Sequence, residues 1–480
     1  MSIPAALQTR PLPSVDTMNI DTTILEPLVI TKNFCRFVLE RKGILDSGST
    51  IQLAVKVPGS AATPNVACLP LHTGIHAAIN RAVLRIGTKV VAITDSYGTY
   101  ATVHRSCKTA EEKSQKDFVT KGTIDAVCPS LGQDGMYDLR DVDLVAAAIP
   151  PAVSNFQPLA QQFLKSADGE SPLYTIKISD LFPMMRSVQL PLYIITEPCS
   201  IELHFNVQNG VAADQGKLAV FMDTTVPLNT RTAEVDTTSV RFLCDYLTYS
   251  DDSMNEASSL AASEQGMVIP YEDVVTTNTN FPAVAAPVNP TPATYIRDIG
   301  ISGMKVRTIL GHYRENTADF SPQVLGQYKS AASAFPLSYN LRVNDKEVYQ
   351  RPQDNEAKKS TEFAQCMNAP ISVGNGEYSF DSLTDKESAL RPTNNDYISA
   401  SHLGPVGTSI PLRTLQGGSH FTGTDFSSPG NYGVSCGQKP VRVTSTLTST
   451  ATDYGGRTVS YFSMVERSMA IRGGVVTVSA

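Results

Sequence analysis

Tryptophan is absent from this 480-residue chain, and charged residues make up only 18% of it. Lysine and arginine number 39 against 46 acidic residues, which gives a formal net charge of −7. A chain with this balance has no general attraction for nucleic acid. A basic stripe interleaved with aromatic residues, the usual mark of a nucleic-acid site, is also missing. We therefore expect no sequence-specific nucleic-acid binding.

Segments that direct a chain to export or to a membrane are missing from the sequence. The N-terminus has no basic start followed by an apolar core, and no apolar run approaches the roughly 18 residues of a membrane span. No Asn-x-Ser/Thr glycosylation site occurs, because Pro290 excludes Asn289-Pro290-Thr291. We expect a protein without a membrane span that is made and used inside a cell, or in a particle assembled there.

Motifs for metals and nucleotides are also missing. The sequence has no GxxxxGK[ST] and no GxGxxG after a strand. His72 and His76 have i, i+4 spacing, but HTGIH lacks the glutamate of a zinc-protease helix. No CxxC pair occurs, and scattered cysteines of this kind are typical of free thiols in a reducing compartment. The eight are Cys35, Cys68, Cys107, Cys128, Cys199, Cys244, Cys366 and Cys436. We predict no metal site and no cofactor site.

One segment resembles an enzyme motif. Asp46-Ser47-Gly48-Ser49 follows two apolar residues, as in the signature of aspartic proteases. That chemistry needs two carboxylates that share one proton. A second copy of the motif is missing, since Asp223-Thr224-Thr225 lacks the glycine. We interpret the segment as a Ser/Gly turn between strands and Asp46 as non-catalytic, with a hydrolase that uses Asp46 as the alternative.

The clearest structural signal is a strict alternation that begins after Pro198. Apolar residues alternate with polar ones for eight positions, which predicts a strand with one buried face and one outward face. A proline just before a strand removes no hydrogen bond from its interior. The predicted inward residues are Ile201, Leu203, Phe205 and Val207, and the outward ones are Ser200, Glu202, His204 and Asn206.

Two parts of the chain recur near the C-terminus. The alternating run from Ile201 has a weaker copy that begins at Val441, 240 residues later. The segment 84–91 resembles 341–348, at an offset of 257 residues. Both members of the second pair have the pattern of strand, tight turn and strand, with Gly87 or Asn344 at a position that can adopt positive φ. Two matched pairs in the same order indicate a duplicated all-β domain.

The rest of the chain divides around these repeats. Residues 1–28 lack periodicity and contain a single basic residue, which predicts an N-terminal arm that cannot neutralise a genome. We assign 29–250 to the first domain, 251–266 to a linker helix and 267–480 to the second domain. The helix rests on Met254, Ala257, Leu260 and Ala261 at helical spacing, with Gly266 as its end.

Long polar segments separate the predicted strands. We expect loops at 119–172, 274–293 and 350–435, because these ranges are rich in Gly, Pro and small polar residues. Gly473-Gly474 is predicted to kink the last strand or to form a bulge. Many short strands, long loops and two repeated halves favour two β-sandwiches in tandem.

With these residues in view, the chain resembles the double-jelly-roll major capsid proteins of double-stranded DNA viruses, a lineage that includes tectiviruses, adenovirus and virophages. The resemblance is greatest to the virophage and Polinton-like branch. It rests on loose patterns and extends over most of the chain from Leu28 onward. The patterns are ISDLFPMMRSVQLPLYIITEPCSIELHFN from Ile178, AVLRIGTKVVAI from Ala82, VRFLCDYLTY from Val240 and ERSMAIRGGVVTVS from Glu466.

The resemblance implies a fold and a structural function. The fold would be all-β, with two tandem eight-stranded jelly rolls standing side by side in the shell. Three chains would form a homotrimer of pseudo-hexagonal outline, which tiles an icosahedral capsid around a double-stranded DNA genome. The implied partners are neighbouring capsomers, pentons and minor capsid or cement proteins, and the implied location is the virion, assembled inside the host cell. No catalytic, cofactor-binding or metal residues would be needed.

Two other classes of function remain open beside the capsid interpretation. One is the hydrolase with Asp46 as its catalyst. The other is a carbohydrate-binding or adhesion module, because jelly rolls are common lectin scaffolds. The missing tryptophan counts against a sugar site, since such sites favour exposed aromatic rings for stacking.

The scattered cysteines generate the first testable prediction. Thiol titration of denatured, unreduced protein should find all eight cysteines reduced, because no pattern in the sequence indicates a disulfide framework. Four or fewer free thiols would contradict the assignment to a reducing compartment.

Overall fold

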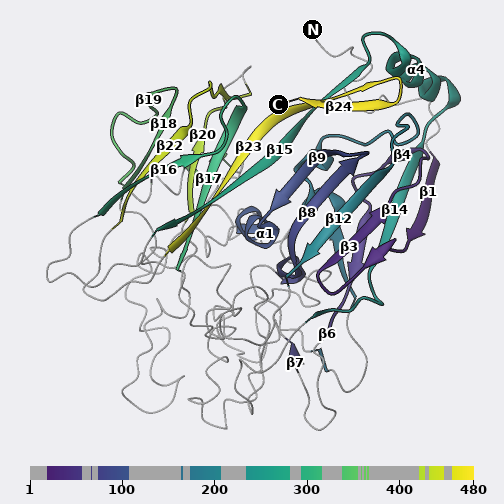
Figure 1. The fold of residues 1–480 in the computed structure, drawn as a ribbon, viewed down its shortest axis with the longest axis horizontal. Coiled ribbons are helices and arrows are strands. Elements are labelled where there is room, and N and C mark those ends of the chain that lie inside the picture. The colour runs from purple at the N-terminus through teal and green to yellow at the C-terminus, as the bar shows by residue number, and fades with distance from the viewer. Residues whose placement is uncertain are drawn as a thin grey trace, which may run out of the picture.

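A computed structural model describes the strands of both repeated halves. The described residues are 19–56, 66–67, 74–106, 164–165, 173–206, 234–281, 293–315, 338–354, 358, 362–363, 365–366, 421–427, 432–447 and 457–479. Most of each of the expected loops at 119–172 and 350–435 lies outside them. Two layered β structures stand side by side, one from strands β1 to β14 (the first half) and one from β15 to β24 (the second half) (Figure 1).

The first half is a sandwich of two sheets around one core. One sheet has the order β1-β14-β5-β11, with β4 also paired to β14, and the other has the order β2-β3-β12-β8-β9. Phe37 on β3 meets Phe242 on β14 edge to face, with ring centroids 5.7 Å apart, so the two sheets face each other. The first sheet consists of β1 (Asn19–Leu25), β4 (Ile44–Leu45), β5 (Thr50–Leu53), β11 (Tyr174–Lys177) and β14 (Arg241–Thr248). The second consists of β2 (Val29–Ile30), β3 (Phe34–Val38), β8 (Ile79–Ile86), β9 (Lys89–Asp95) and β12 (Cys199–Phe205).

The second half is also a sandwich of two sheets. One has the order β15-β23-β17-β20, with β21 paired to β17 and β24 to β23, and the other has the order β16-β22-β18-β19. The Tyr339 hydroxyl on β18 donates to the Gly423 carbonyl on β20 and lies 3.0 Å from Thr424 Oγ1 on the same strand, which joins the layers. The first sheet consists of β15 (Met267–Phe281), β17 (Lys305–Glu315), β20 (Phe421–Asp425), β21 (Val434–Ser435), β23 (Arg457–Arg472) and β24 (Val475–Ser479). The second consists of β16 (Ala293–Ile299), β18 (Ser338–Val343), β19 (Lys346–Glu347) and β22 (Val441–Leu447).

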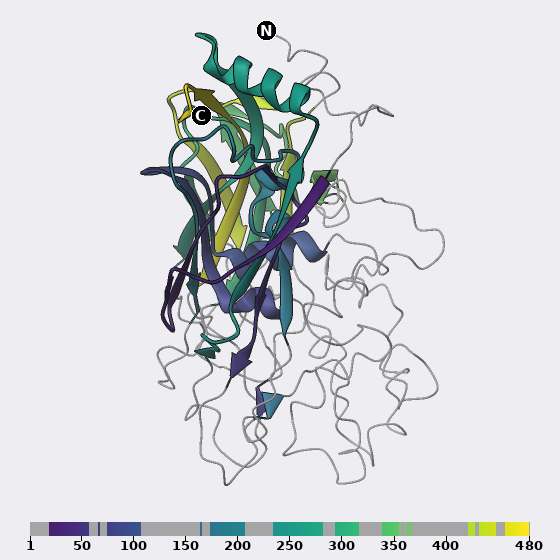
Figure 2. The ribbon, with the colours of Figure 1, turned by 90° about the vertical axis from the view of Figure 1, so that its right-hand side faces the viewer.

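Short pairs and helices complete the described chain. Two isolated two-stranded pairs join β10 (Leu164–Lys165) to β7 (Val66–Ala67) and β13 (Glu234–Val235) to β6 (Val55–Lys56). The helices are η2 (Gly74–Ala78), α1 (Tyr97–Ser106), α3 (Ile178–Leu181), η5 (Pro183–Arg186) and α4 (Asp251–Ala262). Figure 2 shows α4 lying across one end of the strands. The helix predicted from Met254 and Ala257 is therefore present; its function as a linker stays a prediction.

The duplication inferred from the two sequence pairs is confirmed by the pairing of the strands. In the first half β12 pairs with β8 of the β8–β9 hairpin, and in the second half β22 pairs with β18 of the β18–β19 hairpin. Both turns begin at a residue with positive φ, Gly87 at +59° and Asn344 at +50°. In the second turn Asp345 also has a positive φ, +64°, and two such residues in succession are what a two-residue hairpin turn of type I′ requires.

The strand predicted from the alternation is β12, in the middle of its sheet. Ile201 and Leu203 are fully buried and Phe205 is 6% exposed, as expected; Val207 lies outside the described residues. Glu202 lies on the outward face and pairs with Arg85, Oε2 to Nε, at 2.8 Å. Ser200 is on the same face but is only 1% exposed, because Arg36 lies over it and donates to its hydroxyl.

Four details of the sequence interpretation are corrected by the structure. The loop expected at 274–293 begins with strand, because β15 continues to Phe281 in unbroken register with β23. Gly473-Gly474, predicted to be a kink or a bulge, is the turn between the long strand β23 and the short strand β24, with φ +57° and +82°. The loop expected at 350–435 contains strands β20 and β21, which both pair with β17. Residues 19–25 of the predicted arm form β1, which pairs with β14.

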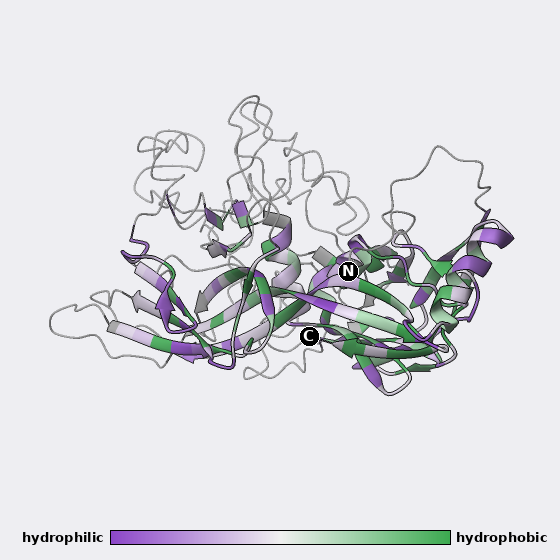
Figure 3. Cartoon of the chain, turned by 90° about the horizontal axis from the view of Figure 1, so that it is seen from above, coloured by the Kyte–Doolittle hydropathy of each residue, from purple (hydrophilic) through white to green (hydrophobic). Residues whose placement is uncertain are grey.

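The long strands β15 and β23 connect the two halves. Together with β24 they form a ribbon that leaves the second sandwich and passes over the first half toward α4 (Figure 1). Val459, Tyr461 and Val465 of β23 belong to the core of the second half, whereas Met469 and Ile471 further along the strand belong to the core of the first. Viewed from above, hydrophobic residues are concentrated in the strands of the first half (Figure 3).

Burial of β12 generates a prediction for Phe205→Ala. Removing this ring should lower the free energy of unfolding by about 3–5 kcal/mol, through lost burial and the cavity left behind. Urea unfolding followed by far-UV circular dichroism measures the change. Leu173→Ala is the control, because Leu173 is 56% exposed and its truncation should change stability by less than about 0.5 kcal/mol. Equal stability of the two variants would contradict the position of β12.

Candidate functional site

The interface between the two halves is built on the free edge of strand β9. β9 is the last strand of its sheet, so the backbone groups of alternate residues point away from β8. Side chains of β15 meet these groups. The Tyr271 hydroxyl donates to the Val91 carbonyl over 2.7 Å, and Thr276 Oγ1 donates to the Asp95 carbonyl over 3.1 Å. Asp273 lies between them, with its carboxyl group near the backbone N–H of Ile93.

The residues that contact each other across the interface occur in the same order along both strands. Tyr271, Asp273 and Thr276 follow Val91, Ile93 and Asp95 in order, so β15 runs parallel to β9. The backbone ladder of β15 goes to β23 instead. Side chains therefore replace the strand that would otherwise extend the sheet of the first half, and the edge is closed without joining the two sheets.

The turn between β23 and β24 makes a second contact with the first half. The Gly474 carbonyl accepts hydrogen bonds from the backbone N–H of Thr196 over 2.9 Å and from its Oγ1 over 3.0 Å. A Cβ atom at Gly474 would lie 2.4 Å from the Thr196 methyl group, and its φ is +82°. Only glycine suits both conditions. Glu197 accepts from the Val476 N–H over 3.1 Å, and Lys89 donates to the Val476 carbonyl.

Buried rings add apolar contact below these hydrogen bonds. Tyr100 on α1 packs against Phe462 on β23, with ring centroids 5.7 Å apart. Both side chains are almost fully buried, and they belong to the same apolar cluster as Ile201 and Phe242. The core of the first half thus includes side chains of the second. Because each Å² of buried apolar area stabilises a protein by about 25 cal/mol, this shared core favours a fixed arrangement of the two halves.

An ion pair is buried within this interface. Arg467 Nη1 on β23 lies 3.0 Å from Asp273 Oδ2 on β15, and Asp273 is fully buried. Among the described residues, neither carboxylate oxygen of Asp273 accepts a well-aligned hydrogen bond. Burial raises the pKa of Asp273 to about 7, although Arg467 and the backbone N–H groups of Val274 and Ile93 act to lower it.

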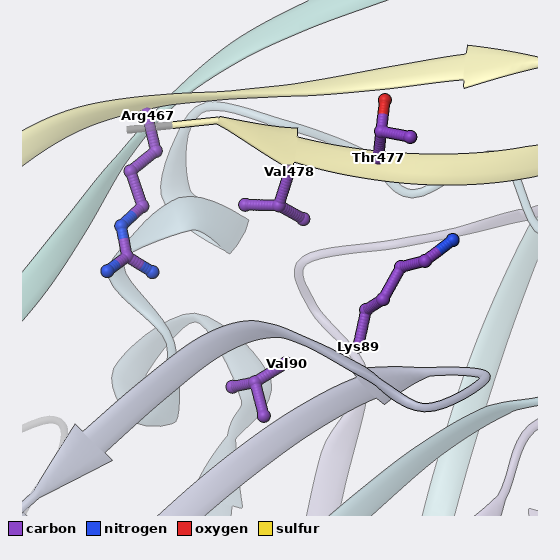
Figure 4. A pocket seen from close by; sticks show the side chains of 5 residues that line it. All are labelled: Lys89, Val90, Arg467, Thr477 and Val478. Atoms are coloured by element: carbon purple, nitrogen blue, oxygen red, sulfur yellow. The ribbon is translucent and has the colours of Figure 1, made fainter.

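A cavity of about 530 Å³ lies beside the ion pair. Its walls come from β9 of the first half and from β23 and β24 of the second. Arg467 and Val478 point from the ribbon toward β9, where Val90 and Lys89 line the opposite side (Figure 4). Lys89 Nζ lies 3.5 Å from Glu197 Oε1, so each of the two cations that line the cavity has an acidic partner.

Asp46, the residue of the protease-like motif, has a local structural function. Its Oδ2 accepts from the Gly48 N–H over 2.9 Å, and its Oδ1 accepts from Gln189 Nε2 over 3.3 Å. The first of these bonds closes the turn between β4 and β5, as the interpretation of a Ser/Gly turn predicts. Asp223 lies outside the described residues.

The described cysteines and His76 are interior residues. Burial raises the pKa of Cys35, Cys199 and Cys244 to about 12, which keeps them as unreactive thiols. The free buried cysteines are Cys35, Cys199, Cys244, Cys366 and Cys436, and the other three lie outside the described residues. His76 Nδ1 lies 2.7 Å from the Tyr97 hydroxyl; His72 is not described.

The described part of the chain contains neither a metal-ion cluster nor a membrane-spanning helix. It holds no cluster of three or more His, Cys, Asp or Glu side chains arranged for a metal ion. Of the helices in the same residues, none has both the length and the apolar character to cross a membrane.

Solved structures match the fold, although no protein-family model and no curated protein sequence matches this chain. VP54 of PBCV-1, a crystal structure fitted into a cryo-EM reconstruction of the virophage Sputnik, has a TM-score of 0.57 at 7% identity, over 98% of this chain and 99% of VP54. A chain of the cryo-EM structure of the Sputnik virophage gives 0.52 at 9% identity, over 100% and 92%. The major capsid protein of Faustovirus gives 0.50 at 8% identity, over 97% and 92%.

These likenesses define the fold. The chain has the double jelly roll that was expected from its sequence patterns, and the likeness extends over nearly its full length. The interface between the halves was missed at the sequence level. The run Tyr271-Glu272-Asp273-Val274 has no regular polar–apolar alternation, and nothing in it indicates that β9 is its partner.

The edge contacts of β9 generate a prediction for Tyr271→Phe. Loss of the hydroxyl leaves the buried Val91 carbonyl without its donor, which should lower the free energy of unfolding by about 1–3 kcal/mol. Urea unfolding measures the change. Tyr249→Phe is the matched control, because the Tyr249 hydroxyl has no hydrogen-bond partner among the described residues. If both variants unfold at the wild-type urea concentration, the Tyr271 hydroxyl contributes nothing to the interface.

Proposed function

We propose that this chain is a major capsid protein of a double-stranded DNA virus. Three copies form a homotrimer of pseudo-hexagonal outline, and these trimers tile an icosahedral shell. The observation that supports this most strongly is the structural likeness to VP54 and to the Faustovirus major capsid protein, which extends over nearly the full length of this chain. The protein is then located in the virion, assembled inside the host cell.

The interface between the halves supports this proposal on physical grounds. A pseudo-hexagonal tile made from three chains needs two similar lobes held at a constant angle. The capped edge of β9, the buried Tyr100 and Phe462 rings and the contact between Gly474 and Thr196 hold the lobes together at three places. A three-fold rotation then closes the assembly, and two lobes from each chain give six around the axis.

Exposed apolar residues on the outer edge of the first half suit contacts between copies. Strand β1 is the edge of one sheet and β2 the edge of the other. In Figure 1, β1 lies on the side of the first half away from the second. Apolar residues exposed together at sheet edges mark surfaces that are covered by another chain. The exposed residues of this segment are Ile20, Ile24, Leu28, Val29 and Val38.

The proposed function is structural, without catalysis. The Asp46 carboxylate closes its own turn. Nothing in the described part of the structure favours a hydrolase or a carbohydrate-binding module over a shell protein. Neighbouring trimers, pentons and minor capsid or cement proteins are the proposed partners. Neither sequence-specific nucleic-acid binding nor a membrane span is part of the proposal.

The mass of the assembly that the purified protein forms in solution tests this proposal. Size-exclusion chromatography with light scattering should give three times the chain mass of 51.7 kDa. The trimer should persist at 0.5 M salt, because the exposed segment at 20–38 is apolar and burial of apolar surface does not depend on charge screening. A monomer of 51.7 kDa at micromolar concentration would contradict the trimeric capsomer.

A further inference from the structure

Asp273 is the one fully buried carboxylic acid among the described residues, and it lies where the two halves meet. Its neighbours Tyr271 and Thr276 on β15 cap the edge of β9, so Asp273 occupies the middle of the contact. The Asp273 carboxyl group faces the Ile93 N–H of the first half and the Arg467 guanidinium of its own half. A change of charge at this position therefore acts directly on the contact between the halves.

The charged and titratable groups around Asp273 are few. Arg467 on β23 is the close cation, and Tyr271 is the neighbouring hydroxyl on β15. From β9, Lys89 lines the adjoining cavity but pairs with Glu197, and Asp95 pairs with Arg81. Arg186, at the end of η5, faces Tyr100, and β24 contributes no charged residue. Only Arg467 balances the charge of Asp273 at close range.

Full ionisation of this acid is unfavourable in the closed interface. An ionised carboxylate taken from water needs both close charge and good hydrogen bonds. Asp273 has the positive charge of Arg467 close by, but its oxygens accept no well-aligned hydrogen bond among the described residues. In its neutral form the group loses most of the desolvation penalty. Arg467, whose side chain is 17% exposed, then faces the adjoining cavity (Figure 4).

We propose that Asp273 is a protonation-sensitive latch between the two jelly rolls. Protonated Asp273 keeps β15 closed on the edge of β9, and ionised Asp273 favours opening of this contact. The device lies beyond the proposed shell function, because it concerns the two halves of one chain and operates whether or not copies assemble.

The direction of the pH dependence follows from the pKa of Asp273. In the closed state burial raises this pKa to about 7, whereas in an open or unfolded chain it is about 4. The closed state therefore binds more protons between these two values. Its stability is greatest below pH ~4, falls as the pH rises toward 7 and levels off above it. Acid tightens the interface and neutral to alkaline pH loosens it.

Hydrogen exchange of the full-length wild-type protein tests the latch directly. After correction for the intrinsic pH dependence of exchange, protection of peptides that cover 89–95 should fall by roughly ten- to a hundredfold between pH 5 and pH 8. Peptides that cover 199–205 serve as the internal control, because β8 separates β12 from β9 in the sheet and β12 should keep its protection. An equal response of the two regions would overturn the proposal.

Two variants assign the effect to Asp273. Asp273→Asn should remove the pH response of 89–95, since the amide does not titrate. Glu272→Gln should keep the full response, because the adjacent Glu272 points to the other face, where it meets Arg307 and Tyr432. A response that persists in Asp273→Asn would overturn the latch. If Asp273→Asn fails to fold, the comparison within the wild-type protein decides.

Discussion

The free edge of β9 is the constraint on which the arrangement of the two halves depends. A buried strand edge must satisfy its backbone N–H and C=O groups, and an exposed one invites pairing with other chains. This chain closes the edge with hydroxyl and carboxyl side chains of β15 rather than with a backbone ladder. Each sheet therefore keeps its own twist, while the spacing of the side chains determines the register between the halves.

The ribbon of β15, β23 and β24 turns this local contact into a property of the whole molecule. β23 contributes to one core through Val459 and Tyr461 and to the other through Met469 and Ile471. A strand shared in this way transmits the position of one sandwich to the other. A trimeric tile made from three copies of one chain needs two lobes held at a constant angle. Lobes that move relative to each other would not present matched edges to neighbouring copies.

Local patterns in the sequence were sufficient for part of the fold. The alternation around Ile201 predicted the buried face of β12, since a slip by one residue would bury Glu202 and His204. Gly87 and Asn344 predicted the two equivalent hairpin turns, because glycine and asparagine are the residues that most readily adopt positive φ. Both residues have positive φ in the structure. Duplication was also visible, although the two halves pair in registers that differ by two residues: Ile201 faces Leu84, whereas Val443 faces Leu341. An even shift keeps the same faces buried.

Other features depend on partners that are distant in the sequence. The polar residues Thr276 to Asn280 resemble a loop, yet they form strand because β23 pairs with them along their whole length. The turn at Gly473-Gly474 was mistaken for a kink because the docking of Gly474 on Thr196 lies 278 residues away in the chain. For the same reason the capped edge of β9 and the buried Asp273 became visible only in three dimensions.

The most direct test of the proposed shell subunit is a cryo-EM reconstruction of the purified protein. The account predicts particles with three-fold symmetry and six β-sandwich densities around the axis, with the paired densities of each chain joined by continuous density for β15 and β23. Single two-lobed particles, or assemblies in which the angle between the two lobes varies from particle to particle, would contradict it.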